Sequence, residues 1–374
     1  MSTTPQFRWD VATVLIGPAV LSMTVIPLYV LTIDVSPWVW LMFAVFMLWN
    51  GLSIMAGYHR LWSHTCFSAH PIIRIIFALG GALAIQNSIL QWCSNHRHHH
   101  QNTDDINAGP YSIHCGFFYA HVGWMLRDYA VARTNLDNIR DLREDAVVVW
   151  QHQWYWPLVL FMNIALVALL GWFDGDILGA LLIAGILRLA LCHHCTFLIN
   201  SLSHYWGQQP YSDANSSRNN TLTVMLTYGD GYHNFHHTFQ WDYRNGHRWY
   251  HFDPTKWLIR GLSAFGLTNS LIRVSLVQIE SVTAAMQLKR ATDCIRRGQL
   301  INTKEWINLL NTEYDRLLTR LNEWSTARGE WLTVRADNLL EKWERTEFRN
   351  QLREIESRLG EQRRQWRMLT SQFA

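Results

Sequence analysis

The chain has 374 residues, enough for one large domain or two ordinary ones. Its formal net charge of only +3 gives no support to a nucleic-acid-binding role. The six cysteines are scattered, which argues against a disulfide-linked secreted scaffold. The 20 tryptophans and 13 tyrosines are typical of a protein with wide membrane–water boundaries, where such rings settle.

Long apolar runs occupy the first two-thirds of the chain. The first two, at about 11–33 and 38–57, are separated by a short turn. The other two, at about 156–172 and 177–200, are joined by the tight turn 173–176. A helix needs about 20 apolar residues to cross the hydrocarbon core of a bilayer. The sequence therefore predicts an all-α integral membrane protein with four transmembrane helices in two hairpins.

The distribution of basic residues predicts the orientation of these helices. Both outer turns contain acidic residues and no Lys or Arg, whereas 58–155 and 201–374 hold nearly all the basic residues. By the positive-inside rule, the two termini and the segments between the hairpins face the cytoplasm, at the inner membrane if the protein is bacterial. The segment 71–92 is apolar but interrupted by polar residues, so we expect an interfacial or half-buried helix there and not a fifth span.

The last hundred residues have a different pattern. We divide the chain into a membrane domain at 1–275 and a cytoplasmic, coiled-coil-like helical tail at 276–374. From about Asn302 onward, apolar residues recur in alternating steps of four and three, with Glu and Arg between them. Gly329 marks a possible bend between two helices. The tail is expected to pack against itself, against a second copy in a homodimer, or on the membrane surface.

Three histidine clusters dominate the sequence, at 59–64, 96–100 and 233–237. Imidazole nitrogen suits iron, copper, zinc or nickel. The last two clusters share the spacing H-x-x-H-H, which on a helix places three rings on one face. We therefore expect two converging triads: His96, His99 and His100, and likewise His233, His236 and His237. With His59 and His64 there are eight histidines, more than one zinc site uses, which favours two metal ions in one cage.

The residues around these clusters resemble the membrane-bound fatty acyl-CoA Δ9 desaturases, of the stearoyl-CoA desaturase-like, bacterial type. The resemblance covers about 10–275 and does not reach the tail. It rests on motifs that recur in order at suitable separations: His59-Arg-Leu-Trp-Ser-His64, His96-Arg-x-His-His100, Gly116–Trp124, Asn200-Ser-Leu-Ser-His204, Gly231–Phe239, Asp242–Gly246 and Phe252–Trp257.

The resemblance implies two Fe ions and a set of ligands. Carried over position by position, the ligands are nine histidines: His59, His64, His96, His99, His100, His204, His233, His236 and His237. Asn200 matches a residue that contacts one iron through water, and it is the one catalytic side chain that the resemblance implies. His98 points to the opposite side of its helix and is expected outside the cage. The acidic string 102–105 is expected either to orient His99 or His100 or to cap a helix.

The same resemblance implies an enzyme, an O2-dependent di-iron desaturase. It would insert a cis double bond, expected at Δ9, into a long-chain fatty acyl thioester. Acyl-CoA is the expected carrier, with acyl carrier protein or an intact lipid as alternatives. Candidate headgroup contacts are Arg97, Arg127 and Arg244, although such residues also contact membrane lipid. The chain has no His-Pro-Gly-Gly string, so we expect an external electron-transfer protein and reductase.

Two other functions fit parts of the sequence. A fatty acid hydroxylase or alkane monooxygenase could use the same scaffold, because one oxidant can hydroxylate or desaturate. A metal-binding membrane transporter would need polar residues inside its spans to form an ion path, whereas these spans are apolar and the histidines flank them.

Overall fold

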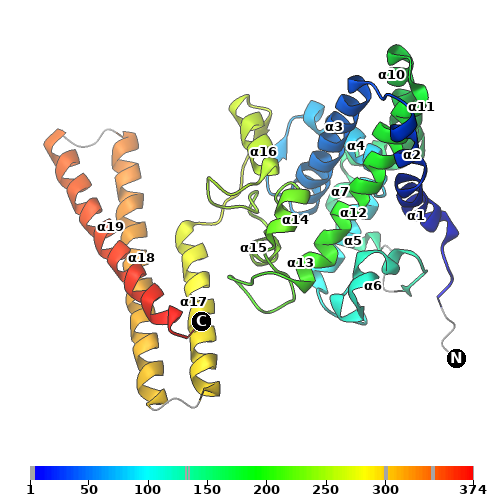
Figure 1. Ribbon diagram of the computed structural model, residues 1–374. Helices are drawn as coiled ribbons and strands as arrows, with labels where there is room; N and C mark the ends of the chain where they lie inside the picture. The colour runs from blue at the N-terminus through cyan, green and yellow to red at the C-terminus, as the bar shows by residue number, and fades with distance from the viewer. Residues whose placement is uncertain (1–4, 131–132, 134, 299–301, 338–341, 374) are drawn as a thin grey trace. The chain divides into compact units, whose positions relative to one another are not determined.

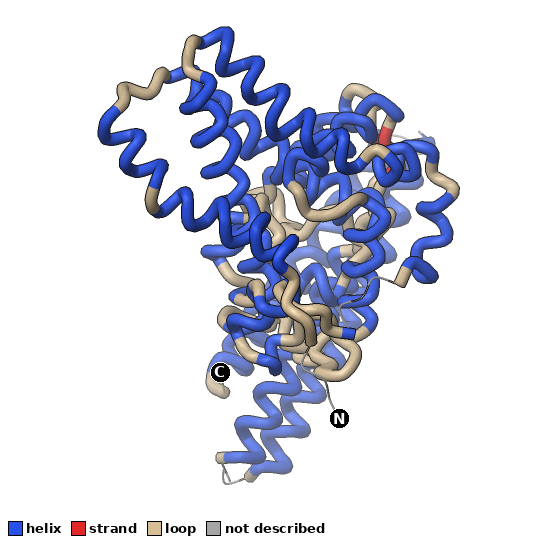
Figure 2. Tube along the Cα trace, turned by 90° about the vertical axis from the view of Figure 1, so that its right-hand side faces the viewer, coloured by secondary structure: helices blue, strands red, loops and turns tan. Residues whose placement is uncertain are grey.

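The fold is described from a computed structural model of residues 5–130, 133, 135–298, 302–337 and 342–373. Most residues in these ranges are helical, and the rest form loops and one short pair of strands (Figure 2). The chain divides into two compact units, one formed by Met1–Gln209 with Asp213–Arg273 and the other by Val274–Ala374 with Pro210–Ser212. The first contains every histidine of the three clusters.

Within the described ranges four helical segments are long and apolar enough to cross a membrane, which confirms the predicted spans. The first span, Trp9–Thr32, contains α1 (Trp9–Met23) and α2 (Val25–Thr32), and the second, Pro37–Ser63, contains α3 (Pro37–Leu52) and the π-helix η1 (Ser53–Ser63). The third, Tyr155–Asp174, contains α9 (Tyr155–Leu160), η6 (Phe161–Ala165) and α10 (Leu166–Asp174). The fourth, Ile177–Tyr205, contains α11 (Ile177–Gly179), η7 (Ala180–Leu187), α12 (Arg188–Asn200) and α13 (Leu202–Tyr205).

The turns of the two hairpins lie at the same end of the membrane unit. The hydroxyl of Ser36 in the first turn donates to Asp174 in the second. Next to it, the hydroxyl of Tyr29 donates to Asp176 Oδ1 at 2.8 Å. Asp176 also accepts from the backbone N–H of Gly179 and so caps the start of the fourth span. These bonds hold the two hairpins side by side.

The segment after the second span differs from the single helix that we expected at 71–92. It forms α4 (Pro71–Ala84) and α5 (Ile89–Gln101), which are bent by 81° at the break between them and together could form a broken fifth span or a re-entrant loop. The first part of α4 is exposed and its last turns are buried against α3 and η1 (Figure 1). A side chain at Gly81 would collide with the Tyr58 ring, so the small residues that interrupt the apolar run allow this close packing.

Short elements outside the spans, here called the cover, pack on the bundle. They are η2 (Ile113–Cys115), α6 (Phe117–His121), η3 (Gly123–Met125), η5 (Leu136–Ile139), α7 (Arg140–Arg143), α8 (Ala146–Gln153), α14 (Thr221–Leu226), α15 (His233–Thr238) and α16 (Pro254–Ala264). Strands β1 (Ser68–Ala69) and β2 (Thr268–Asn269) pair antiparallel, with Ser68 opposite Asn269.

A buried ion pair joins this cover to the second span. The Arg60 guanidinium lies 3.0 Å from Asp253 Oδ1, and both side chains are almost completely buried. Arg60 also donates to the carbonyl of Tyr243 at 2.8 Å. Asp253 in turn accepts from the backbone N–H groups of Asn245 and Gly246, each at 3.0 Å. These additional hydrogen bonds are what a buried ion pair needs to offset its desolvation.

The second unit confirms the predicted helical tail. Helices α17 (Leu276–Arg297), α18 (Thr303–Asp337) and α19 (Lys342–Ser371) pack on one another. They share a core of buried apolar residues: Ala284, Ala291, Ile295, Leu310, Leu317, Leu321, Trp324, Leu359 and Trp366. Leu310, Leu317, Leu321 and Trp324 in α18 have the predicted spacing. The bend expected at Gly329 is wrong, because α18 continues through it. A single glycine costs a helix only about 1 kcal/mol, which the packed core outweighs.

We predict that a chain ending after Ser275 keeps its membrane unit folded and retains its bound metal. The reason is that the tail has its own core and that all the clustered histidines precede this point. Metal content and thermal unfolding of the purified truncated protein measure this directly. In the full-length chain, Leu317→Asp disrupts the tail core alone and should give the same result. Loss of metal from a truncated protein that is still folded would contradict the prediction.

Candidate metal centre

Five histidines from three elements form a first group, here called group A: His59, His64, His96, His100 and His236. Each offers one ring nitrogen, and these nitrogens all lie within 4.8 Å of one another. The Nε2 atoms of His64 and His96 are 2.8 Å apart, and those of His59 and His236 are 3.0 Å apart. Imidazole nitrogens that converge on one point in this way have the chemistry of a transition-metal site.

Four histidines form a second group, here called group B: His99, His204, His233 and His237. Their ring nitrogens also lie within 4.8 Å of one another. His233 Nε2 is 3.1 Å from His204 Nε2 and 3.0 Å from His237 Nε2. The two groups touch, because the His100 and His237 rings stack with their centroids 4.3 Å apart. All nine histidines named from the sequence thus come together.

The division between the groups differs from the convergence that we expected for each H-x-x-H-H string. On α5, His96 and His100 belong to group A and His99 belongs to group B. On α15, His236 belongs to group A, and the other two belong to group B. Neighbouring positions on a helix point about 100° apart. Each string therefore presents rings to both sides of one helical face and contributes to both groups.

A π-helix explains how His59 and His64 reach the same group. In η1 the hydrogen bonds join residues five apart, and the N–H of His64 donates to the carbonyl of His59 at 3.1 Å. This widened turn brings the two rings to a centroid separation of 5.0 Å. On an ideal α-helix the same residues would point about 140° apart. His64 caps the end of η1.

Acidic and hydroxyl groups orient the rings from behind. Asp230, just before α15, lies with one carboxylate oxygen 3.2 Å from His59 Nδ1 and the other 3.9 Å from His233 Nδ1. It therefore contacts one histidine of each group. A carboxylate at Nδ1 favours a ring that holds its proton there and presents an unprotonated Nε2 to a metal. Sequence reasoning missed Asp230, although it stands three residues before His233.

The acidic string 102–105 acts on a different histidine from those we expected. Asp104 accepts from the backbone N–H and the hydroxyl of Ser216, and Ser216 Oγ lies 2.8 Å from His204 Nδ1. The string thus supports His204 in group B and not His99 or His100. Asp105 accepts from the backbone N–H groups of Asn107 and Ala108 and stabilises the turn there. Of the two expectations for the string, the helix cap is confirmed, because Asn102 is the C-cap of α5 and Thr103 donates to the carbonyl of His99. The expectation that the string orients the His99 or His100 ring was wrong, because Asp104 reaches forward in the chain to Ser216.

Burial disfavours the charged form of an imidazole, and metal binding requires the neutral form. Burial and the neighbouring rings lower the pKa of His96, His99, His236 and His237 well below its usual value. The pKa of His100 is lowered in the same way, to about 3. For Asp230 burial would raise the pKa, but the adjacent His59 and His233 hold it below its usual range, so the carboxylate is charged.

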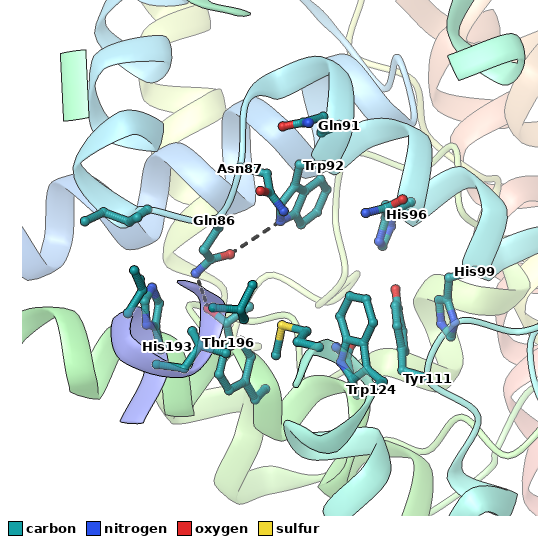
Figure 3. Close-up of a pocket in the computed structure, with 18 of the residues that line it drawn as sticks. Gln86, Asn87, Gln91, Trp92, His96, His99, Tyr111, Trp124, His193 and Thr196 are labelled. Carbon is teal, nitrogen blue, oxygen red and sulfur yellow. Dashed lines mark hydrogen bonds between the residues drawn. The ribbon is translucent and has the colours of Figure 1, made fainter. Parts of the chain in front are cut away.

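A cavity of about 500 Å³ leads up to the histidine groups. In Figure 3, His96 and His99 lie toward one end of it, and His193 and Thr196 lie toward the other. Its wall includes apolar side chains from several elements: Val11, Val14, Leu15, Met55, Trp92, Trp124, Tyr155 and Phe197. Charged residues also line it: Arg8, Asp10, Arg127, Asp128 and Arg133. An elongated apolar ligand with a polar end fits such a pocket.

The remaining residues singled out from the sequence have clear positions. Asn200 lines the same cavity. His98 lies outside both groups, with Nε2 2.8 Å from the carbonyl of Ala108. Of the three candidate headgroup arginines, Arg127 lines the cavity. Arg97 instead makes two hydrogen bonds to Asp141, and Arg244 makes two to Asp242.

A membrane unit with two adjacent groups of histidines on its cover defines a class of membrane-bound metalloprotein. The model of the fatty acid desaturase family matches residues 36–268, more than half of the chain. The chain therefore belongs to the fatty acid desaturase family, as the resemblance predicted.

Individual relatives agree with this assignment. The chain is 44% identical over 233 residues to a probable acyl-CoA desaturase of Schizosaccharomyces pombe, covering 62% of this chain and 48% of the relative. It is 40% identical over 242 residues to acyl-CoA desaturase 1 of Saccharomyces cerevisiae, covering 64% and 47%. To the stearoyl-CoA desaturase of Bos taurus it is 34% identical over 266 residues, covering 70% and 72%. The chain thus spans about half the length of the first two relatives.

Adjacent histidines on α5 allow a sharp test of the site. We predict that His99→Ala lowers the bound metal from about two ions to about one per chain, because it removes one of the four rings of group B. His98→Ala is the matched control and should keep both ions, since that ring bonds a backbone carbonyl. Elemental analysis of the two purified variants measures the difference. Equal loss of metal from both would overturn the assignment of group B.

Proposed function

We propose that this protein is an O2-dependent di-iron desaturase that inserts a cis double bond, expected at Δ9, into a long-chain fatty acyl-CoA. The observation that carries the proposal is the cavity, which is lined by rings of both histidine groups and by apolar side chains. Membership of the fatty acid desaturase family and the printed names of the relatives support it.

For the metal ions we propose iron, held by the nine histidines of groups A and B. Asn200, on the cavity wall, would contact one ion through water. Two irons, when bound, would supply the oxidation that removes hydrogen from unactivated methylene groups, which no side-chain acid or base can perform. The electrons would come from a separate electron-transfer protein and its reductase.

The residues of this chain would bind and orient the substrate. The apolar wall around Met55, Trp92 and Phe197 suits an alkyl chain and excludes water. Arg127, whose guanidinium donates to the carbonyl of Pro5, suits the anionic end of an acyl thioester. Arg8 and Arg133 also line the cavity, but each is paired with an aspartate, Asp10 and Asp128. His59, His96, His99 and His233 all face the cavity, so a chain held there passes both metal positions. Holding one methylene pair in place is the main contribution of the protein to such a reaction.

The direct test is an assay with purified, iron-loaded protein, an electron-donor and reductase system, O2 and a saturated long-chain acyl-CoA. We predict a product lighter by two hydrogens, with one cis double bond, and a loss of more than about 100-fold in turnover for His99→Ala. Mass spectrometry gives the product and the position of its double bond. A hydroxylated product without an alkene would instead identify a hydroxylase on this scaffold. The same acyl group on acyl carrier protein tests the choice of carrier.

We further propose that the site and both termini face the cytoplasm, because the basic residues avoid the two hairpin turns. A Cys294→Ser background leaves Cys115, an exposed cysteine of the membrane unit, as a natural reporter of the predicted inner face. Adding Asp34→Cys places a second reporter in the first outer turn. We predict that an impermeant thiol reagent labels the two positions from opposite sides of vesicles of known orientation. Labelling of both from one side would exclude the four-span topology.

A further inference from the structure

The end of helix α4 lies inside the membrane bundle, away from bulk water. A helix end leaves its last four carbonyls without partners, and in a membrane interior each needs a donor from the protein. Side chains of the third and fourth spans supply these donors to three successive carbonyls: Asn163 Nδ2 to Ala82 at 3.3 Å, Arg188 Nη1 to Leu83 at 2.7 Å and His193 Nε2 to Ala84 at 2.9 Å. We call Asn163, Arg188 and His193 the capping triad.

Arg188 is the central member of the capping triad and is completely buried. Its other nitrogens donate to the carbonyl of Ala184 at 3.1 Å and to Asn163 Oδ1 at 2.6 Å. A charged side chain within a transmembrane segment is costly and is usually found where it serves a function. Here the guanidinium links the third and fourth spans to the end of α4.

The backbone immediately after the cap is strained. Ile85 has φ +49° and Asn87 has φ +74°, both in the left-handed region. A β-branched residue rarely adopts that conformation, and it persists only where the surrounding structure enforces it. The strained turn redirects the chain so that α5 starts at Ile89, bent by 81° from α4. Since α5 provides His96, His99 and His100, the turn sets where three rings of the metal centre stand.

The same turn also forms part of the cavity wall (Figure 3). Gln86 donates to Thr196 Oγ1 at 3.0 Å and accepts from Trp92 Nε1 at 3.4 Å. The Trp92 ring stacks on His96 with the centroids 4.9 Å apart. One short segment therefore connects the wall of the cavity to a ring of group A. Arg188 and Asn163 are not among the residues that line the cavity, so any effect that they have on a ligand is indirect, and this segment provides one connection.

We propose that the capping triad is a set of positioning residues that fixes the strained turn, and with it the register between the cavity and the two histidine groups. This inference rests on the proposed desaturase function. In that reaction, register means which pair of methylenes lies beside the metals. Arg188 and Asn163 would thus determine the position of the double bond without touching the substrate.

The test uses two variants of the full chain, Arg188→Met and Asn163→Leu, which keep approximate size and remove the donors to α4. Arg74→Met is the matched control. Arg74 lies near the start of α4, far from the turn, and its guanidinium is paired with Asp145, which precedes α8. Hydrogen exchange over residues 82–92, metal content and the position of the double bond in the product are measured for each. We expect faster exchange in that segment and an increase of about tenfold or more in products with a displaced double bond. Arg74→Met should change neither.

The possible outcomes separate this proposal from the proposed function. If the wild-type protein forms no alkene, the desaturase function fails, and the exchange data still decide whether the triad holds the turn. If Arg188→Met does not fold, Asn163→Leu decides the question. Variants that make less product at an unchanged position, with unchanged exchange over 82–92, would show that the triad has only a general stabilising role and would overturn the proposal.

Discussion

The structure depends on keeping nine imidazole rings in contact at one end of the membrane helices. Rings whose Nε2 atoms face one another keep this arrangement only if other contacts fix each ring or a cation binds between them. Asp230 lies 3.2 Å from the His59 ring of group A and 3.9 Å from the His233 ring of group B, and Ser216 with Asp104 holds His204. A metal-binding site of this kind depends as much on these outer contacts as on the ligands themselves.

The membrane helices form the platform for this arrangement. Group A takes two rings from the end of the second span, and group B takes His204 from the end of the fourth. The buried pair of Arg60 and Asp253 fixes the cover against η1, one residue from His59. Because each group draws on elements far apart in the sequence, neither forms until the hairpins and their cover have packed together.

Much of this could be read from the sequence because it depends on periodicity and residue type. Apolar runs of sufficient length predicted the four spans, and alternating steps of four and three predicted the helical tail. The histidine strings and their neighbours predicted the family. These features are local, so no knowledge of distant contacts was needed.

Other features escaped sequence reasoning because they depend on tertiary contacts or on unusual backbone. The backbone hydrogen bonds of η1 join residues five apart, and this π-helical pattern has no simple sequence signature. The convergence of His59 and His64 could therefore not be predicted from their spacing. The break at Ile85 places a β-branched residue in a conformation that its type disfavours. The carbonyls just before it, of Ala82 and Leu83, accept hydrogen bonds from side chains about 80 and 100 residues away. The same holds for Ser216, which is an ordinary loop serine until the fold brings it to His204.

The Trp92 side chain lines the cavity and also stacks on the His96 ring. A molecule that enters the cavity touches the same indole that supports a ring of group A. Occupancy of the cavity and the position of the His96 ring are therefore connected through this indole. If metal is bound at group A, a filled cavity would change the absorption or magnetic spectrum of the centre before any bond of the ligand is broken.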